Sequence, residues 1–146
     1  MKSKLINDNG LKTYALIFDE DDEVTQGIKN FTLEKNLTGA SFSGIGAFKK
    51  LTMGYFDIDK KDYIKNEIDE QVEVVSLIGN ISRYKNKPKV HIHLAVGKRN
   101  GNALGGHLLK GIVRPTLEII LNESPAYLQR EFKEEYNLSL INLDKG

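Results

Sequence analysis

The sequence predicts an α+β fold, a mostly antiparallel β-sheet with one main helix and few short ones. Three observations support this. Runs rich in β-branched and aromatic residues follow one another along most of the chain. Apolar residues recur at helical spacing around Val24, Ile28 and Phe31. Asn100-Gly101, a strong hairpin signal, lies between two β-type runs. With no internal repeat or linker in its 146 residues, the chain is expected to form a single domain, residues 1–146.

The first half of the chain is expected to contain a strand, a helix and three further strands. The strand covers Thr13–Asp19, and the acidic run Glu20–Glu23 suits the first turn of a helix that ends near Asn36. The three later strands are Ala40–Phe48, which glycines interrupt, its neighbour Leu51–Ile58, and a short exposed strand at Tyr63–Ile68.

The second half is expected to add further strands and a short helix. The most apolar run, Val72–Tyr84, is expected near the centre of the sheet. Pro115 indicates an edge position or a bulge in the strand that contains it. The remaining elements are strands at Lys89–Gly97, Ala103–Leu109, Gly111–Leu121 and Leu138–Leu143, and a helix at Ser124–Tyr136 with Pro125 in its first turn.

Composition excludes several classes of protein. The 21 basic and 20 acidic side chains give a net charge of +1, so the chain lacks the basic excess typical of a dedicated DNA-binding protein. The absence of cysteine excludes disulfides and thiolate metal sites. The polar start of the sequence and the lack of a long apolar run favour a cytoplasmic protein with no membrane partner.

All three histidines of the chain, His91, His93 and His107, lie within a short stretch. Residues two apart in a strand point to the same face, so His91 and His93 stand side by side while Ile92 and Leu94 face the core. Two imidazoles presented in this way are suited to binding one divalent metal.

The turn at Asn100-Gly101 decides whether His107 joins the other two histidines. A two-residue turn would place His107 opposite Leu94, on the wrong face. A three-residue turn, with glycine in the left-handed conformation, would set it opposite His93. Gly105-Gly106 could also supply the necessary shift as a bulge. The metal hypothesis therefore requires an odd loop or a bulge, and ordinary surface histidines on a hairpin are the alternative.

A site of three histidines with an open fourth position would suit zinc or another divalent first-row ion that holds water or a ligand. Such a metal-bound water could support hydrolysis. No general base stands at a defined spacing. Asp57, Asp59 and Glu118 are candidates because they end or flank strands, and solvated or salt-bridged carboxylates are the alternative.

Three further features are open to both structural and functional interpretation. The glycines of Ser43–Phe48 favour close packing beside a strand or subunit over a phosphate-binding loop. Polar residues within Gly79–Arg83 interrupt an apolar strand, a conflict typical of sites and interfaces. Basic residues cluster around the histidine hairpin, as either solvated charges or nucleic-acid contacts: Lys85, Lys87, Lys89, Lys98 and Arg99.

The His-x-His strand, Gly105–Leu108 (Gly-Gly-His-Leu) and Ser43–Ala47 (Ser-Gly-Ile-Gly-Ala) resemble the plants-and-prokaryotes conserved (PPC) domain, which follows AT-hooks in some plant nuclear proteins. The resemblance extends from about Thr13 to Leu143. It implies an α+β homotrimer, and in some members a metal held by the residues that correspond to His91, His93 and His107. Stand-alone prokaryotic members are described as candidate DNA-binding proteins, but the Arg-Gly-Arg-Pro core of the AT-hook is absent from this chain.

The sequence thus leaves three functional hypotheses. The first is a small homotrimer whose three-histidine site holds a divalent ion, with zinc the best fit, and binds a small anionic ligand. The second is a DNA-associated regulatory module that uses the basic residues around the hairpin. The third is a purely structural oligomerisation domain in which the histidines are incidental. Whether the protein is an enzyme stays open.

Overall fold

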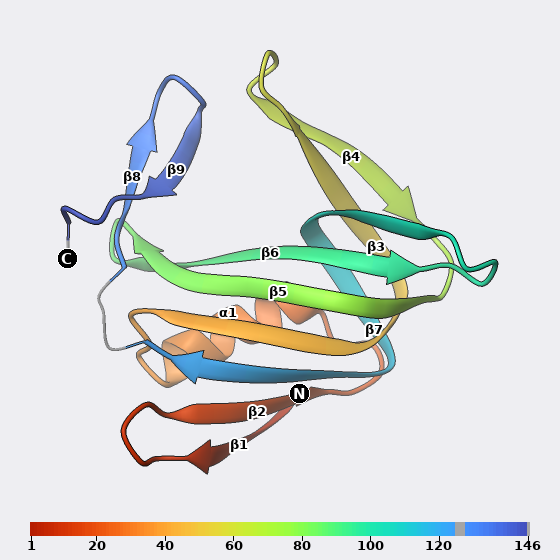
Figure 1. The fold of residues 1–146 in the computed structure, drawn as a ribbon, viewed down its shortest axis with the longest axis horizontal. Helices are drawn as coiled ribbons and strands as arrows, with labels where there is room; N and C mark the ends of the chain where they lie inside the picture. The colour runs from red at the N-terminus through yellow and green to blue at the C-terminus, as the bar shows by residue number, and fades with distance from the viewer. Residues whose placement is uncertain (125–127, 146) are drawn as a thin grey trace.

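The computed structural model describes residues 1–124 and 128–145. Over these residues the chain forms a seven-stranded sheet, a separate two-stranded sheet and one helix (Figure 1). The order of the large sheet is β1-β2-β7-β6-β5-β3-β4, and β7 also pairs with β3. Paired strands in both sheets are antiparallel, as predicted. The elements are β1 (Lys2–Asn7), β2 (Thr13–Phe18), α1 (Val24–Glu34), β3 (Ala40–Asp57), β4 (Asp62–Ile68), β5 (Val72–Tyr84), β6 (Lys87–Gly97), β7 (Ala103–Glu123), β8 (Arg130–Lys133) and β9 (Leu138–Ile141).

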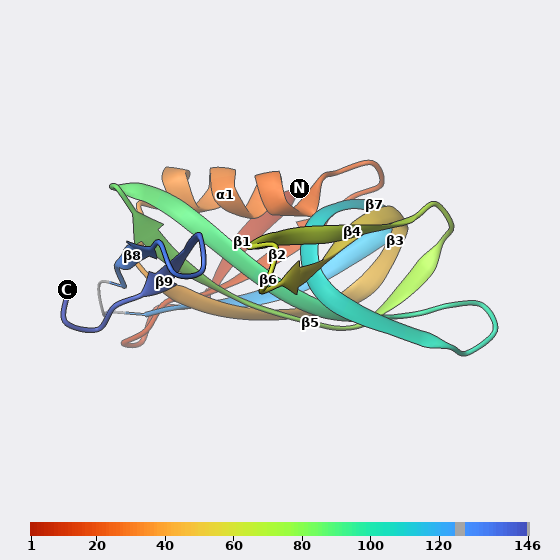
Figure 2. The ribbon, with the colours of Figure 1, turned by 90° about the horizontal axis from the view of Figure 1, so that it is seen from above.

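The helix α1 lies along one face of the large sheet, and the hydrophobic core fills the space between them (Figure 2). Val24, Ile28 and Phe31 are fully buried, as their spacing predicts. The acidic run, however, precedes the helix instead of forming its first turn. Its last residue, Glu23, is the N-cap, and the Glu23 carboxylate accepts hydrogen bonds from two backbone N–H groups of the first turn.

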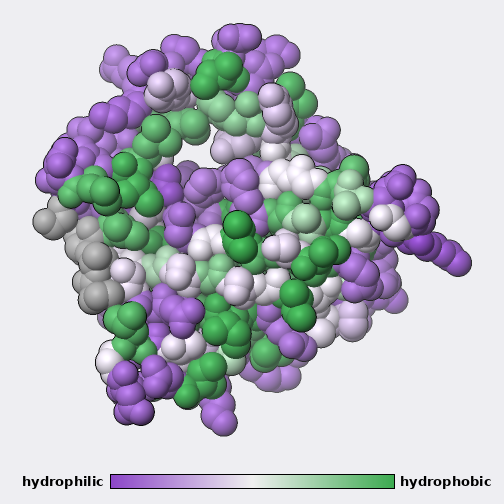
Figure 3. All heavy atoms as spheres, in the orientation of Figure 1, coloured by the Kyte–Doolittle hydropathy of each residue, from purple (hydrophilic) through white to green (hydrophobic). Residues whose placement is uncertain are grey.

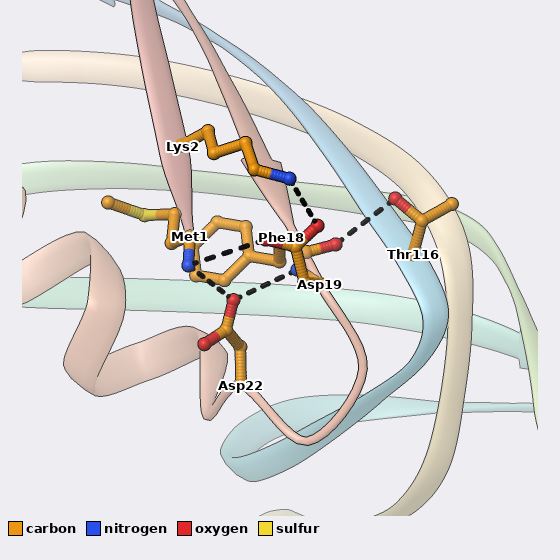
Figure 4. Close-up of polar contacts among 6 residues, drawn as sticks. All are labelled: Met1, Lys2, Phe18, Asp19, Asp22 and Thr116. Carbon is orange, nitrogen blue, oxygen red and sulfur yellow. Dashed lines mark hydrogen bonds and ion pairs between the residues drawn. The ribbon is translucent and has the colours of Figure 1, made fainter.

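Asp22 of the acidic run and Asp19, which precedes it, hold the start of the chain (Figure 4). Asp22 lies 2.6 Å from the amine of Met1, and Lys2 Nζ lies 3.1 Å from Asp19. The contact with the amine, assisted by a hydrogen bond from the Asp19 N–H, holds the pKa of Asp22 below its usual value. These contacts and pairing with β2 form β1, which the sequence did not predict because its residues are all exposed and show no apolar alternation.

Two pairs of predicted strands are continuous in the structure. Ala40–Phe48 and Leu51–Ile58 form the single long strand β3, and the strands predicted at Ala103–Leu109 and Gly111–Leu121 form β7. The polar and glycine residues taken as breaks lie beside irregularities in the β3–β7 register, where bulges let both strands bend without ending. The end of β7, over residues 117–122, lies between β2 and β3, while its beginning, over residues 103–107, pairs with β6.

Pro115 and Gly46 meet at one of these bulges. Gly46 pairs with Leu117 and Phe48 pairs with Val113, so Pro115 lies in the irregular stretch between them, which confirms the predicted bulge. Gly46 has a φ of +150°, and a Cβ at this position would lie 2.7 Å from the Cα of Leu117. The prediction that Ser43–Phe48 provides close packing against a neighbouring strand is therefore confirmed.

The predicted helix at Ser124–Tyr136 is wrong where the structure describes it. Residues 125–127, and with them the expected role of Pro125, lie outside the described residues. Beyond them, β8 pairs with β9 as a hairpin. The segment is extended because it docks on β5 of the main sheet: Arg83 N–H donates to Leu128 O at 2.8 Å, and Arg130 Nε donates to Ser82 Oγ at 2.6 Å. These tertiary contacts override the helical tendency of the local sequence.

The sheet face opposite α1 carries exposed apolar side chains, which Figure 3 shows gathered over β3, β5 and β7. The residues are Ile45, Val75, Ile78 and Ile120, which are 60%, 61%, 58% and 44% exposed. Among residues 1–124 and 128–145, no helix is both long and apolar enough to cross a membrane.

Candidate metal centre

The strand β6 presents His91 and His93 on the face of the sheet opposite α1. The alternating side chains Ile92 and Leu94 are buried in the core, at 1% and 6% exposure, as the strand pattern predicts. On the neighbouring strand, His93 pairs with Ile78. Because directly paired residues share a face, the histidines lie on the same side as the exposed apolar residues.

The turn between β6 and β7 has the three-residue form that the metal hypothesis requires. Lys98 N–H donates to Asn102 O at 2.8 Å, and Gly101 closes the loop with a φ of +83°. His93 consequently pairs with His107, on the same face. The conditional prediction of an odd loop is confirmed. Gly106 pairs in register with Leu94, so the glycines form no bulge toward β6.

The three imidazoles converge on one point of the sheet. Their ring centroids lie 5.0 Å apart for His91 and His93, 5.0 Å for His91 and His107, and 5.4 Å for His93 and His107. One ring nitrogen from each lies within 4.8 Å of the others. Two strands and one turn thus bring together residues that the sequence separates by up to 16 positions.

This donor set fits a divalent ion. A tetrahedral ion with metal–nitrogen distances of about 2.1 Å holds its ligand nitrogens about 3.4 Å apart. The separations in the cluster exceed that value by no more than about 1.4 Å, a distance that side-chain rotation can close. His91 and His107 are partly buried while His93 is exposed, so the cluster opens toward solvent and leaves room for a further ligand.

The protonation state of the cluster also suits a metal. Burial, assisted by the positive charge of neighbouring histidines, lowers the pKa of both His91 and His107 to about 4. Both rings are therefore neutral at pH 7 and carry the lone pair that a metal needs. His107 Nδ1 is buried and has no hydrogen-bond partner among the described residues. Such a nitrogen is costly to bury unless something binds it.

A groove of about 430 Å³ adjoins the cluster and is lined by His91, His107 and residues of the β8–β9 hairpin. The Tyr63 ring lies against His107 with centroids 4.8 Å apart. The tips of the β3–β4 and β8–β9 hairpins contact each other through two hydrogen bonds. Lys61 Nζ donates to Glu134 O and Asn137 Nδ2 donates to Lys61 O, each at 3.4 Å. Figure 3 shows an opening where these hairpins arch over the sheet.

Arg130, on β8, also lines the groove. It donates hydrogen bonds from Nε to Ser82 Oγ at 2.6 Å, from Nη1 to Ser139 O at 2.7 Å and from Nη2 to Asn80 Oδ1 at 3.2 Å. Arg130 is not among the site residues that the sequence predicts, because it lies in the segment predicted as a helix. The polar residues of Gly79–Arg83 were the available signal, since Asn80 and Ser82 are the acceptors that hold it.

The candidate bases do not join the histidines. Asp57 is the last residue of β3, and its Oδ1 accepts from the N–H groups of Asp59 and Lys60 in the following turn at 3.1 and 3.0 Å. Glu118 is exposed on β7 and pairs with Ile17 and Ile45. Neither Asp57, Asp59 nor Glu118 lines the groove. Their interpretation as solvated or locally bonded carboxylates is the one that the structure supports.

The basic residues around the hairpin form two groups instead of one. Lys85 and Lys87 lie at the β5–β6 turn, while Lys98 and Arg99 lie at the opposite end of β6 (Figure 1). The 11 residues of β6 separate them by about 36 Å. Lys98 is engaged by Glu70 at 2.6 Å, and Lys89 lines the groove.

Solved structures similar to this one cover almost the whole chain. A candidate DNA-binding protein from Bacteroides thetaiotaomicron has a TM-score of 0.91 and 26% identity over 98% of this chain and 99% of its own. A PPC protein from Pyrococcus horikoshii has a TM-score of 0.85 and 33% identity over 94% and 97%. A metal-containing protein from Archaeoglobus fulgidus has a TM-score of 0.83 and 32% identity over 97% and 96%.

Curated relatives match a smaller share of their own length. The bifunctional protein GlmU from Synechococcus sp. is 29% identical over 119 residues, which cover 80% of this chain and 18% of GlmU. The chain therefore spans less than a fifth of that protein. The profile of the Plants and Prokaryotes Conserved (PCC) domain matches residues 6–125, which include all three histidines. The chain belongs to the Plants and Prokaryotes Conserved domain family.

Proposed function

We propose that this protein is a small homotrimeric metalloprotein in which His91, His93 and His107 hold one divalent ion per subunit, with zinc the best fit. The observation that carries the proposal is the convergence of the three imidazole nitrogens within 4.8 Å of one another. Neutral rings at His91 and His107 and the buried free Nδ1 of His107 support it. The Archaeoglobus fulgidus protein, which resembles this chain over its whole length, is described as metal-containing.

The ion would keep an open position toward the groove. With three protein ligands, the fourth position of a tetrahedral ion takes water or another ligand. Bound there, the ion supplies a positive charge that attracts an anion and acidifies a water. His91 and His107 both line the groove, so this position is accessible to a small molecule. Binding of a small anionic ligand is the function that this arrangement supports best.

Elemental analysis of protein purified without a nickel column tests the metal site. We expect about one equivalent of a divalent metal per chain, or uptake of one equivalent when zinc is added. Replacing the exposed His93 with Gln should lower zinc affinity without disturbing the core, while Lys87→Gln, on the same face of β6 but outside the groove, should leave it unchanged. Less than about a tenth of an equivalent after zinc addition would overturn the proposal.

The exposed apolar face supports self-association. Ile45, Val75, Ile78 and Ile120 form a patch of the kind that soluble proteins bury against partners. Light scattering should give a mass three times the 16.4 kDa of the chain. Ile78→Lys should shift the protein toward the monomer, and a clean monomer of the unmodified protein would contradict the trimer.

DNA binding is the second candidate, favoured by the resemblance to the Bacteroides thetaiotaomicron protein. Lys85 and Lys87 at the β5–β6 turn are the contacts that it would use. Specific DNA binding has a Kd of about 10⁻⁸–10⁻¹¹ M, so the absence of a complex in a gel-shift assay at about 150 mM salt and micromolar protein would exclude it. A trimer that binds neither metal nor DNA would leave the third candidate, a structural oligomerisation domain.

A further inference from the structure

Arg130 carries a positive charge that no carboxylate balances within residues 1–124 and 128–145. Its three hydrogen-bond acceptors, Ser82 Oγ, Ser139 O and Asn80 Oδ1, are all neutral. None of the ion pairs among the described residues includes it. The guanidinium is partly buried, and burial lowers its pKa from the usual value. A partly buried cation held only by neutral groups retains a strong attraction for an anion.

The guanidinium and the histidine cluster share one groove. Arg130 lines the groove together with His91 and His107. Its charge is close enough to contribute to the lowered pKa of both histidines. Lys89 also lines the groove, and no aspartate or glutamate does so among the described residues. The groove therefore carries a net positive charge even before any metal is bound.

The walls of the groove are largely apolar and aromatic. Tyr63 and Phe132 contribute rings, and Leu109 and Leu140 contribute aliphatic surface. Apolar walls with a few polar groups are typical of sites for organic molecules, because the walls bind the body and the polar groups fix its orientation. A bare inorganic anion would gain nothing from these side chains. Their presence favours an organic ligand.

The hydrogen bonds of Arg130 fix its orientation and leave donors free. A guanidinium has more N–H groups than the three that bind Ser82, Ser139 and Asn80. Because these bonds join β8 to β5 and β9, the guanidinium is held in place before a ligand arrives. Its remaining donors match the planar geometry of a carboxylate.

We propose that Arg130 forms a subsite for the carboxylate of a small organic acid, whose apolar or aromatic body lies between Tyr63 and Phe132. The inference rests on the proposed function, because the metal ion would bind a second polar group of the same acid in the same groove. The arginine subsite itself uses no metal. The two ideas can therefore be tested separately.

The experiment compares acids with their uncharged amides. Monocarboxylates from acetate to 3-phenylpropionate, each with its matched amide, and inorganic phosphate are titrated into metal-free and zinc-loaded protein by calorimetry and NMR. At least one acid with an apolar body should bind at least about tenfold more tightly than its amide and than phosphate. Arg130→Gln should remove that preference, and Arg130→Lys, which keeps the charge but loses the planar fork, should weaken it. Arg99→Gln is the matched control at an exposed turn.

The outcomes separate the two proposals. If zinc binds but no acid is preferred over its amide, the arginine subsite is wrong and the metal site stands. If no metal binds but an acid is preferred and Arg130→Gln abolishes the preference, the metal site is wrong and the subsite stands. Equal binding of phosphate and the best acid would overturn the organic-acid class. The acid–amide comparison uses unmodified protein, so the absence of any preference for an acid refutes the subsite even if Arg130→Gln detaches the β8–β9 hairpin.

Discussion

Metal-free protein should lose stability as the pH falls, because His91 and His107 are held neutral in the folded state. Burial, with the charge of neighbouring histidines, lowers the pKa of each to about 4. In the unfolded chain a histidine titrates with a pKa of about 6.5. Between these values the unfolded state binds more protons than the folded state. The stabilisation is therefore complete above pH 6.5 and is lost as the pH falls toward 4.

The size of the effect follows from the two pKa values. From pH 7.5 to 5.0, protonation of one unfolded histidine lowers the free energy of unfolding by about 2 kcal/mol if the folded ring stays neutral. Both rings are only partly buried, so solvent screening reduces this to about 1 kcal/mol each. The two histidines together should therefore lower the free energy of unfolding by about 2 kcal/mol between pH 7.5 and pH 5.0.

Urea denaturation of protein stripped with a chelator measures this difference. The double variant His91→Gln/His107→Gln serves as the reference, because it retains every other group that titrates in the same range. Between pH 7.5 and 5.0 the free energy of unfolding of the unmodified protein should fall by about 2 kcal/mol more than that of the variant. Equal losses would refute the reasoning, since they would mean that the two rings are protonated as readily in the folded chain as in the unfolded one.

Three further predictions concern the scaffold, each measured by urea denaturation. Leu94→Ala should lower the free energy of unfolding by about 2–5 kcal/mol, since Leu94 is 6% exposed within the core; a loss below 1 kcal/mol would contradict that packing. Gly46→Ala should cost more than Gly10→Ala: both have positive φ, but a Cβ at Gly46 would meet the Cα of Leu117 at 2.7 Å while Gly10 faces open space. If the two substitutions lowered the free energy of unfolding equally, the positive φ alone would explain the loss, and the close approach of Gly46 to Leu117 would not contribute. Glu23→Ala should cost about 1–2 kcal/mol, because its carboxylate accepts three backbone N–H bonds, and an unchanged midpoint would exclude the capping role.

The sequence predicts the elements whose pattern is local. The apolar spacing of α1 and the alternation of β6 were sufficient to place Ile28, Ile92 and Leu94 in the core. The same alternation set His91 and His93 side by side. For His107 the sequence could only state a condition, because one residue in a turn reverses the face of every later side chain. The structure meets that condition through the three-residue loop that Gly101 closes.

The elements that were predicted wrongly from the sequence depend on contacts between residues far apart in the chain. Whether β3 ends at Lys49 depends on bulges in its pairing with β7, and these are not encoded by any local signal. The β8–β9 hairpin depends on Arg130 reaching Asn80 and Ser82, 50 and 48 positions earlier. The polar interruption in β5 marked one end of that contact, but nothing local identified its partner. The groove, which needs both ends, could not be predicted.

The family match ends within the groove. The three histidines lie within residues 6–125, whereas Arg130 and the rest of β8 and β9 lie beyond that range. If the histidines hold a metal, substitutions in the C-terminal hairpin would change which molecule the groove selects while the metal site stays as it is. Selectivity for a ligand can therefore change independently of the ability to hold the ion.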